Sequence, residues 1–394
     1  MITFVALLMF LQLGVGWEQS TLLCGLLTLP WVLKSFVRAK LRQMGHYARQ
    51  LNVLELGMCA TMGIQAFCFT ERLNSQWTIF AALFVLCLLC AAHELVARMY
   101  YEHMLRPSRQ QYFNSLKMFI SQSTVVLTYG VMIVGVGLLE VFYYTRRNAV
   151  ALSWSMAVYM LAGVYLVLVV YNLFALRPPQ FASDHASSSL LGAMRAEVRV
   201  IDRIAHKPHW LGCVACLALM LMPQALLFHT RVLLFMAPHA QGGMAASLQW
   251  IGLSQGTVGV IAFSTGLALG HWRQRPELSA LLLGLSPLAY WVLTLVHPSG
   301  LMPLCVTALV AQFCFGYGLN ATMPFVRYIS GERYRSTINY LYIPLVSLVM
   351  LPPIAASGWL VTHLGFTHFF LIDALLALPS WLATFIGFRL IRTP

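Results

Sequence analysis

Twelve apolar runs follow one another along this chain, and their lengths decide which folds are open to it. They cover residues 1–15, 20–37, 51–70, 77–97, 114–139, 150–176, 209–233, 244–270, 278–296, 299–321, 338–362 and 366–388. Most approach the roughly 20 residues that a helix needs to cross about 30 Å of hydrocarbon. The alternation typical of a membrane barrel is not seen, so each run is predicted to be a transmembrane helix. The first run is short for a full crossing.

The composition agrees with a chain that is solvated largely by lipid. Hydrophobic residues make up 59% of it and charged residues only 9%, whereas soluble domains carry about 25% charged residues. We therefore predict an all-α, multi-pass integral membrane protein with membrane lipids around it. The net charge of +13 does not indicate a nucleic-acid partner, because the basic residues sit in short loops between apolar runs.

The distribution of these cations predicts the orientation. Four of the 25 lysines and arginines fall in odd-numbered connections, namely Arg72, Arg146, Arg147 and Arg231, and the other 21 fall on the opposite side. Because basic loops stay on the cytoplasmic side, we expect the even-numbered connections and both termini there.

One long polar stretch divides the runs six and six. We expect residues 1–176 to form an N-terminal bundle and residues 209–394 a C-terminal bundle. Residues 177–208 would form a cytoplasmic linker with an amphipathic helix on the inner leaflet. Two six-helix halves around a substrate path are typical of the major facilitator fold. Gly130, Gly135 and Gly137 are expected to allow close helix approach.

Charged residues inside such runs need a reason, because each costs about 2.5–3.5 kcal/mol at mid-membrane. Glu94 follows His93 and precedes Arg98 by one helical turn, so Glu94 and Arg98 share a helix face. A carboxylate in this setting is a candidate proton carrier, or else the pair anchors the helix at the inner interface. Glu55 is explained equally well by interfacial solvation. Asp373 is expected to face a helix neighbour or water.

Two further sets of residues are candidates for substrate contact. Lys34 follows Pro30 and Trp31 and either reaches the inner interface or holds an anionic substrate in the cavity. Gln312, Tyr317 and Asn320 share one apolar run, where they either bind a sugar or cross-link helices.

Enzymatic motifs are not found in the sequence. It has no phosphate-binding loop for ATP and no metal-ligand spacing among its 12 histidines. The nine cysteines lie mostly in apolar runs and imply packing rather than disulfides. We expect neither an enzyme nor a cofactor.

Several ordered stretches resemble the AmpG-type muropeptide permeases of the major facilitator superfamily. They are residues 29–34 (LPWVLK), 256–262 (GTVGVIA), 357–366 (SGWLVTHLGF) and 368–380 (HFFLIDALLALPS). The likeness runs over most of the chain and is strongest from Gln249 onward. It implies proton-driven import of anhydromuropeptides (GlcNAc-anhydroMurNAc-peptides) or related amino-sugar ligands across a bacterial inner membrane, for recycling of the cell wall. Trp31 and Lys34 belong to the first stretch.

The chain departs from the family at three acidic positions. Arg42, Arg98 and Ala311 stand where the family has acids, which leaves Glu94 as the main candidate for proton coupling. Two alternatives therefore stay open. One is a carrier of the same fold for another large anion such as an acyl-coenzyme A. The other is a diverged membrane protein that no longer transports.

Overall fold

The protein is all-helical over the part of the chain that the structure, a computed structural model, describes. This part is residues 2–392 apart from 45, 71–74, 106, most of 177–207, 274 and 331–334. The predicted linker and its amphipathic helix lie outside the described residues, except for isolated positions. Nine helices in the described part are long and apolar enough to cross a membrane, and Ile2–Gln12 is a shorter apolar helix.

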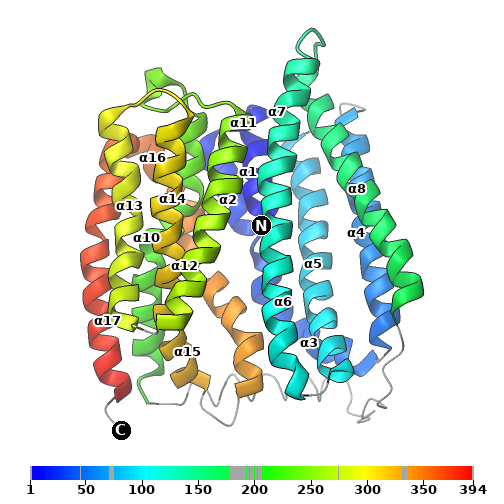
Figure 1. Cartoon of the computed structure of the whole chain (residues 1–394), viewed down its shortest axis with the longest axis vertical. Coiled ribbons are helices and arrows are strands. Elements are labelled where there is room, and N and C mark those ends of the chain that lie inside the picture. Colours follow the sequence, from blue (N-terminus) through cyan, green and yellow to red (C-terminus); the bar gives the residue numbers. More distant parts are fainter. Residues whose placement is uncertain are drawn as a thin grey trace.

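The N-terminal half contains the helices up to α8, with α1 and α2 near the centre of Figure 1 and α3 to α8 on the right. Its elements are α1 (Ile2–Gln12), α2 (Trp17–Leu26), α3 (Leu29–Met44), α4 (Tyr47–Thr70), α5 (Gln76–Met104), α6 (Pro107–Val126), the π-helical η1 (Leu127–Met132), α7 (Ile133–Phe142) and α8 (Ala149–Ala175). Helices α2 and α3 together fill the second predicted run, and α6, η1 and α7 form one continuous rod. The six expected segments of this half are therefore present.

The C-terminal half follows the same plan. Its elements are α10 (Trp210–Met236), the short η2 (His239–Gln241), α11 (Leu248–Ile251), the π-helical η3 (Gly252–Val258), α12 (Gly259–Arg273), α13 (Pro276–Val296), α14 (Leu301–Gly318), η4 (Leu319–Ala321), α15 (Thr322–Ser330), α16 (Arg335–Leu375) and α17 (Ala377–Arg392). Helix α16 is two helices joined at Gly365, which has a φ of 73°, and the last predicted run is formed by the part after Gly365 together with α17. A positive φ is open to glycine at little steric cost.

The first helix is short and central. At a rise of about 1.5 Å per residue, the 11 residues of α1 span roughly 16 Å. In Figure 1 it begins about half-way up the molecule and runs upward. Its residues from Thr3 to Phe10 are all buried, and the core cluster around them draws residues from both halves. A cytoplasmic N-terminus stays a prediction.

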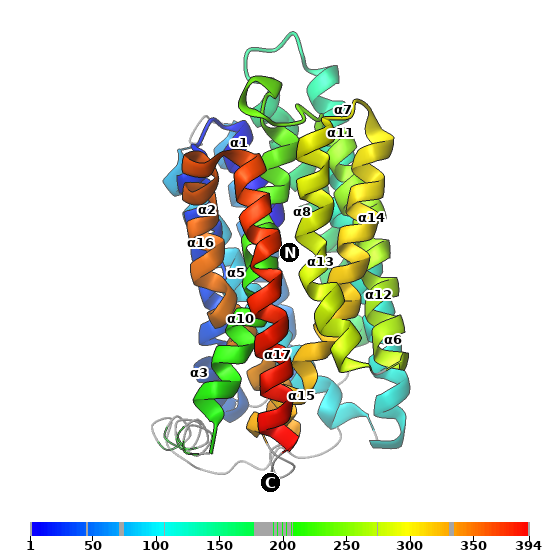
Figure 2. The ribbon, with the colours of Figure 1, turned by 90° about the vertical axis from the view of Figure 1, so that its left-hand side faces the viewer.

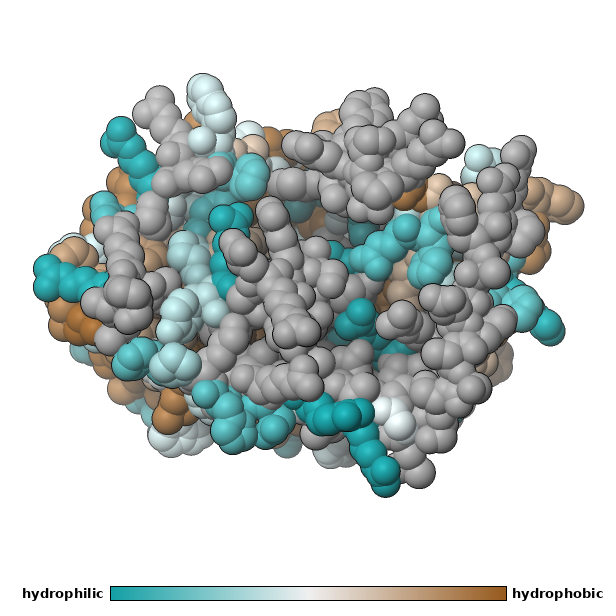
Figure 3. Space-filling view, turned by 90° about the horizontal axis from the view of Figure 1, so that it is seen from below, coloured by the Kyte–Doolittle hydropathy of each residue, from teal (hydrophilic) through white to brown (hydrophobic). Residues whose placement is uncertain are grey.

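The outer surface is apolar, as the composition predicts. Helix α8 exposes one stripe of side chains, Met160, Val164, Val167, Tyr171 and Phe174, each more than half exposed. Their spacing of three and four residues places them on one helix face. Such a face is suited to contact with lipid. Hydrophilic side chains gather instead on the lower end of the molecule, where the C-terminal end lies (Figures 2 and 3).

The two halves meet along a seam of paired helices. Across it, α2 and α3 pack on α16, η1 packs on η3, and α7 packs on α11. Glycines make this contact close: the α-carbon of Gly256 rests on the backbone of Tyr129, and Gly137 faces Gln249. The prediction of close approach is confirmed for Gly130, which faces Thr257, and for Gly137, whereas Gly135 faces open space.

Candidate functional site

The predicted site residues of α3 and α5 form two separate polar groups. Lys34 Nζ lies 3.0 Å from Glu94 Oε1, and its side chain is only 2% exposed. The nearby Arg98 places its Nε 3.5 Å from Glu102 Oε1. Glu94 therefore forms its ion pair with Lys34 from another helix. It does not pair with Arg98, although the sequence suggested that pair. The lysine does not extend to the interface, because it is buried. Trp31, one turn earlier, is half-buried against the main core.

His93 joins a second group that includes a carboxylate ascribed to interfacial solvation. Its Nε2 lies 3.1 Å from Glu55 Oε1, and the Asn172 amide donates to both oxygens of Glu55 at 3.0 and 2.9 Å. Three helices, α4, α5 and α8, thus converge on one buried carboxylate. The interfacial explanation of Glu55 is wrong, because the side chain is 9% exposed and its partners come from protein.

Gln312, Tyr317 and Asn320, which were predicted to act together, do not lie in one group. Gln312 is buried beside the hydroxyl of Tyr290 on α13 and so belongs to the polar cluster described next. Asn320 instead donates to the carbonyls of Leu267 and Tyr317 at 3.3 and 3.1 Å, where α14 packs on α12. Asn320 and the buried Tyr317 therefore cross-link helices in this structure, as the alternative interpretation held.

Arg231 is a buried cation close to the contact between the two halves. Its sequence position predicted a loop. That assignment is wrong: Arg231 lies inside α10, five residues before its end. Its side chain is buried, its Nε has no hydrogen-bond partner, and its Cζ lies 5.4 Å from the centroid of the Phe228 ring. Arg231 forms no ion pair with any residue in the described part of the chain.

Two phenol hydroxyls lie near this guanidinium, and amide groups lie beside one of those hydroxyls. Its electrostatic neighbours are the phenols of Tyr290 and of Tyr129, and the latter comes from η1 across the seam. The Gln255 amide on η3 donates to the Tyr290 hydroxyl at 3.1 Å. Phe4 of α1 stacks on Tyr129 with the ring centroids 4.5 Å apart. We call Arg231, Tyr129, Tyr290, Gln255 and Gln312 the seam cluster.

Two more titratable groups are buried in the C-terminal half. Both ring nitrogens of His229, which lies two residues before Arg231 on α10, are buried without a hydrogen-bond partner. The same is true of both carboxyl oxygens of Asp373 on α16, which is 0% exposed. Of the two expectations for Asp373, a helix neighbour or water, full burial excludes water. These partners are missing within the described part of the chain.

The seam cluster contains one buried cation without an ion-pair partner in the described part of the chain, and this has a consequence for ligand binding. An unpaired buried charge is costly, and burial strengthens its attraction to an opposite charge. The phenol groups near it, and the amides beside one of them, offer donors and acceptors that fix the orientation of a polar ligand. The arrangement is therefore suited to binding an anionic group. The sequence does contain an indication that Arg231 lies inside a helix, because the apolar residues 232–236 follow it.

Comparison with solved structures identifies the fold. A bacterial homologue of the human lysosomal transporter Spinster, inward-facing and occupied, aligns with a TM-score of 0.74 and 13% identity, covering 98% of this chain and 92% of that one. A D-xylose-proton symporter aligns with a TM-score of 0.65 and 12% identity over 97% and 92%.

The xylose transporter XylE from E. coli, inward-open, aligns with a TM-score of 0.60 and 10% identity over 96% and 91%. No protein-family model matches the sequence, and neither does any curated protein. Near-complete coverage of both chains, with the helix order and seam described above, shows that the chain has the major facilitator fold of polytopic membrane transporters.

Proposed function

We propose that the protein is a secondary transporter that carries an anionic solute between its two halves by alternating access. The observation that carries this proposal is Arg231, a buried guanidinium without an ion-pair partner in the described part of the chain. Substrate sites of transporters with such repeats lie near the bilayer midplane between the repeats. Ionisable residues buried in a membrane mark such pathways.

The proposed substrate class is the anhydromuropeptides or related anionic amino-sugar ligands. The support is the ordered likeness to AmpG-type permeases together with a site that suits a carboxylate. Peptide carboxylates of such a ligand would accept hydrogen bonds from Arg231, and its hydroxyl and amide groups would pair with Gln255, Gln312 and Tyr290. The basic loops would face the cytoplasm of the inner membrane, as their distribution predicts.

Proton coupling is proposed to use the polar groups of the N-terminal half. Glu55 is within hydrogen-bond distance of His93, whose side chain is 26% exposed and so the more accessible of the two. A proton can pass from the imidazole to the carboxylate over this contact. Protonation of Glu94 would break its ion pair with Lys34 and leave the lysine free to move. The pathway thus contains His93, Glu55, Glu94 and Lys34, with Trp31 and Arg98 beside it.

The test is uptake into proteoliposomes. Labelled GlcNAc-anhydroMurNAc-tripeptide is offered with an inward proton gradient, with and without an uncoupler, and Arg231→Gln is the matched variant. We expect uptake that the uncoupler abolishes and that the variant lacks. Uptake unaffected by the uncoupler contradicts proton coupling. Absence of uptake for this ligand, with uptake of an acyl-coenzyme A in its place, contradicts the substrate class. Binding without any uptake contradicts transport.

A further inference from the structure

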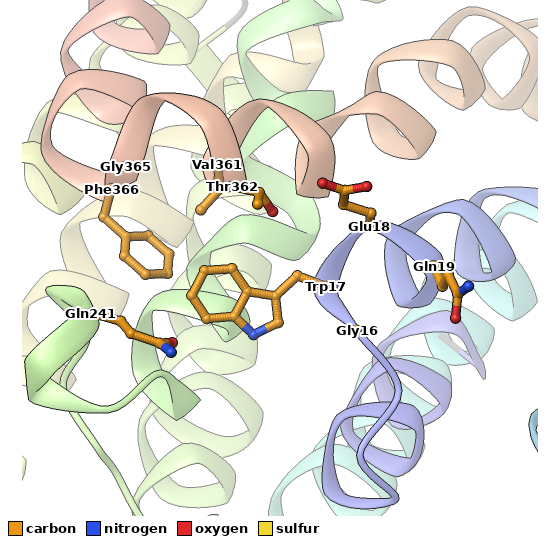
Figure 4. Close-up of a pocket in the computed structure, with 9 residues that line it drawn as sticks. All are labelled: Gly16, Trp17, Glu18, Gln19, Gln241, Val361, Thr362, Gly365 and Phe366. Carbon is orange, nitrogen blue, oxygen red and sulfur yellow. The ribbon is translucent and has the colours of Figure 1, made fainter.

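A cavity of about 760 Å³ opens at the upper end of the molecule, away from the seam cluster. Its lining residues are Gly16, Trp17, Glu18, Gln19, Gln241, Val361, Thr362, Gly365 and Phe366 (Figure 4). They come from three connections: the start of α2, the segment after α10, and the break in α16. One connection belongs to the N-terminal half and two to the C-terminal half, so an occupant would touch both halves at once.

Two aromatic rings give this cavity an apolar wall. The indole of Trp17 lies beside the ring of Phe366, with centroids 5.4 Å apart and planes tilted by 50°. The rings touch each other, so no cation fits between them as it would in an aromatic cage. They form instead an apolar corner, in which the flat apolar face of a ligand can lie on one ring and its edge against the other.

Polar groups line the remaining sides. Within the described part of the chain, the side chains of Glu18, Gln19 and Gln241 have no hydrogen-bond partner, and all three are exposed. The Thr362 hydroxyl donates to the Gly358 carbonyl at 2.9 Å, so its oxygen remains an acceptor. Carboxylate and amide groups beside an aromatic surface match vicinal hydroxyls on the edge of a sugar ring.

We propose that this cavity binds an uncharged saccharide, with an apolar ring face and its edge against Trp17 and Phe366 and its hydroxyls on Gln241, Gln19 and Glu18. Glu18 is the charged member of the lining, so an anionic sugar is repelled. The volume falls within the roughly 300–1,000 Å³ typical of small-ligand sites. This binding does not depend on the proposed transport, because the site is separate from Arg231.

The experiment measures binding to the full chain in lipid nanodiscs by saturation-transfer difference NMR. The probes are N,N′-diacetylchitobiose as neutral sugar, N-acetylneuraminate as anionic sugar, and tetramethylammonium as cation. We expect saturation transfer to the neutral disaccharide and none to the other two. Trp17→Leu should weaken binding by about tenfold, a change of roughly 1.4 kcal/mol, whereas Trp77→Leu, a 63% exposed tryptophan outside the cavity, should bind as the natural protein does.

Two further variants keep the test decisive. Trp17→Phe retains an aromatic face and should keep most of the affinity, which guards against a Trp17→Leu protein that fails to fold. Glu18→Gln should admit N-acetylneuraminate. Equal binding by Trp17→Leu and Trp77→Leu, or a preference for tetramethylammonium, overturns the proposal. Binding is repeated with Arg231→Gln: disaccharide binding that persists there supports this site whether or not transport is found, and its loss overturns the separation of the two sites.

Discussion

The two halves of this molecule treat buried acidic, basic and histidine side chains in opposite ways. In the N-terminal half they are paired: Lys34 with Glu94, Glu55 with His93 and Asn172. In the C-terminal half, Arg231, His229 and Asp373 have buried atoms without a hydrogen-bond partner in the described part of the chain. A buried pair is balanced within the protein, whereas an unpaired buried charge would gain from an anionic ligand. Under the proposed function, this difference would place proton handling in one half and solute binding in the other.

The largest effect is expected where the unpaired charge is removed. Arg231→Gln should lower uptake at least roughly 30-fold, because loss of a buried charge contact costs about 2–5 kcal/mol. Thermal unfolding in detergent should show unchanged or greater stability, since replacing a buried unpaired charge removes its desolvation cost. Full uptake by Arg231→Gln, or marked destabilisation, would show that the arginine is structural. Arg231→Lys, which keeps the charge, serves as the conservative control.

The next effect concerns the place where the halves touch. An alanine at Gly256 would push its methyl group into the backbone of Tyr129, so Gly256→Ala should destabilise the fold by about 1–3 kcal/mol. Gly135→Ala and Gly163→Ala meet nothing within 4 Å and should keep or slightly raise stability. Urea unfolding of the three variants in mild detergent measures this. Equal stability for all three contradicts the close seam.

The paired half is tested by breaking one pair. Glu94→Gln leaves the buried Lys34 ammonium without its partner and should cost about 1–3 kcal/mol, less than a fully buried pair because Glu94 is 36% exposed. Replacing both partners by Met should recover most of that loss. If the double variant is no more stable than Glu94→Gln in thermal unfolding, the two side chains do not act as a pair.

The smallest effect is a change of coupling rather than of stability. Glu55→Gln keeps a side chain of the same shape, so Asn172 still finds an acceptor, but it cannot take a proton. We expect uptake driven by a proton gradient to fall about tenfold, a change of roughly 1.4 kcal/mol, while exchange of solute without a gradient continues. The counterflow assay compares the two directly, and equal loss of both would place Glu55 in folding instead of coupling.

The sequence predicted the helices better than it predicted the side-chain contacts between them. Apolar runs as long as a bilayer leave little freedom, so the helical segments followed from length and hydropathy, whereas the domain boundaries stay a prediction. Arg231 was misplaced because the seventh run was ended at residue 233 and a charge so near its end was counted with the following connection, although apolar residues continue to Met236. Lys34 and Glu94 are 60 residues apart, and Glu55 and Asn172 are 117 apart. Contacts of this kind depend on helix rotation, which hydropathy does not specify.

The π-helical segments η1 and η3 have a consequence for how binding is transmitted. Tyr129 lies in η1 and Gln255 in η3, and these are the segments whose backbones rest directly on each other at Gly256. No layer of side chains lies between them to absorb a displacement. Under the proposed alternating access, a solute that shifted the Tyr129 ring or the Gln255 amide would act directly on the contact between the two halves, without a relay of intervening residues.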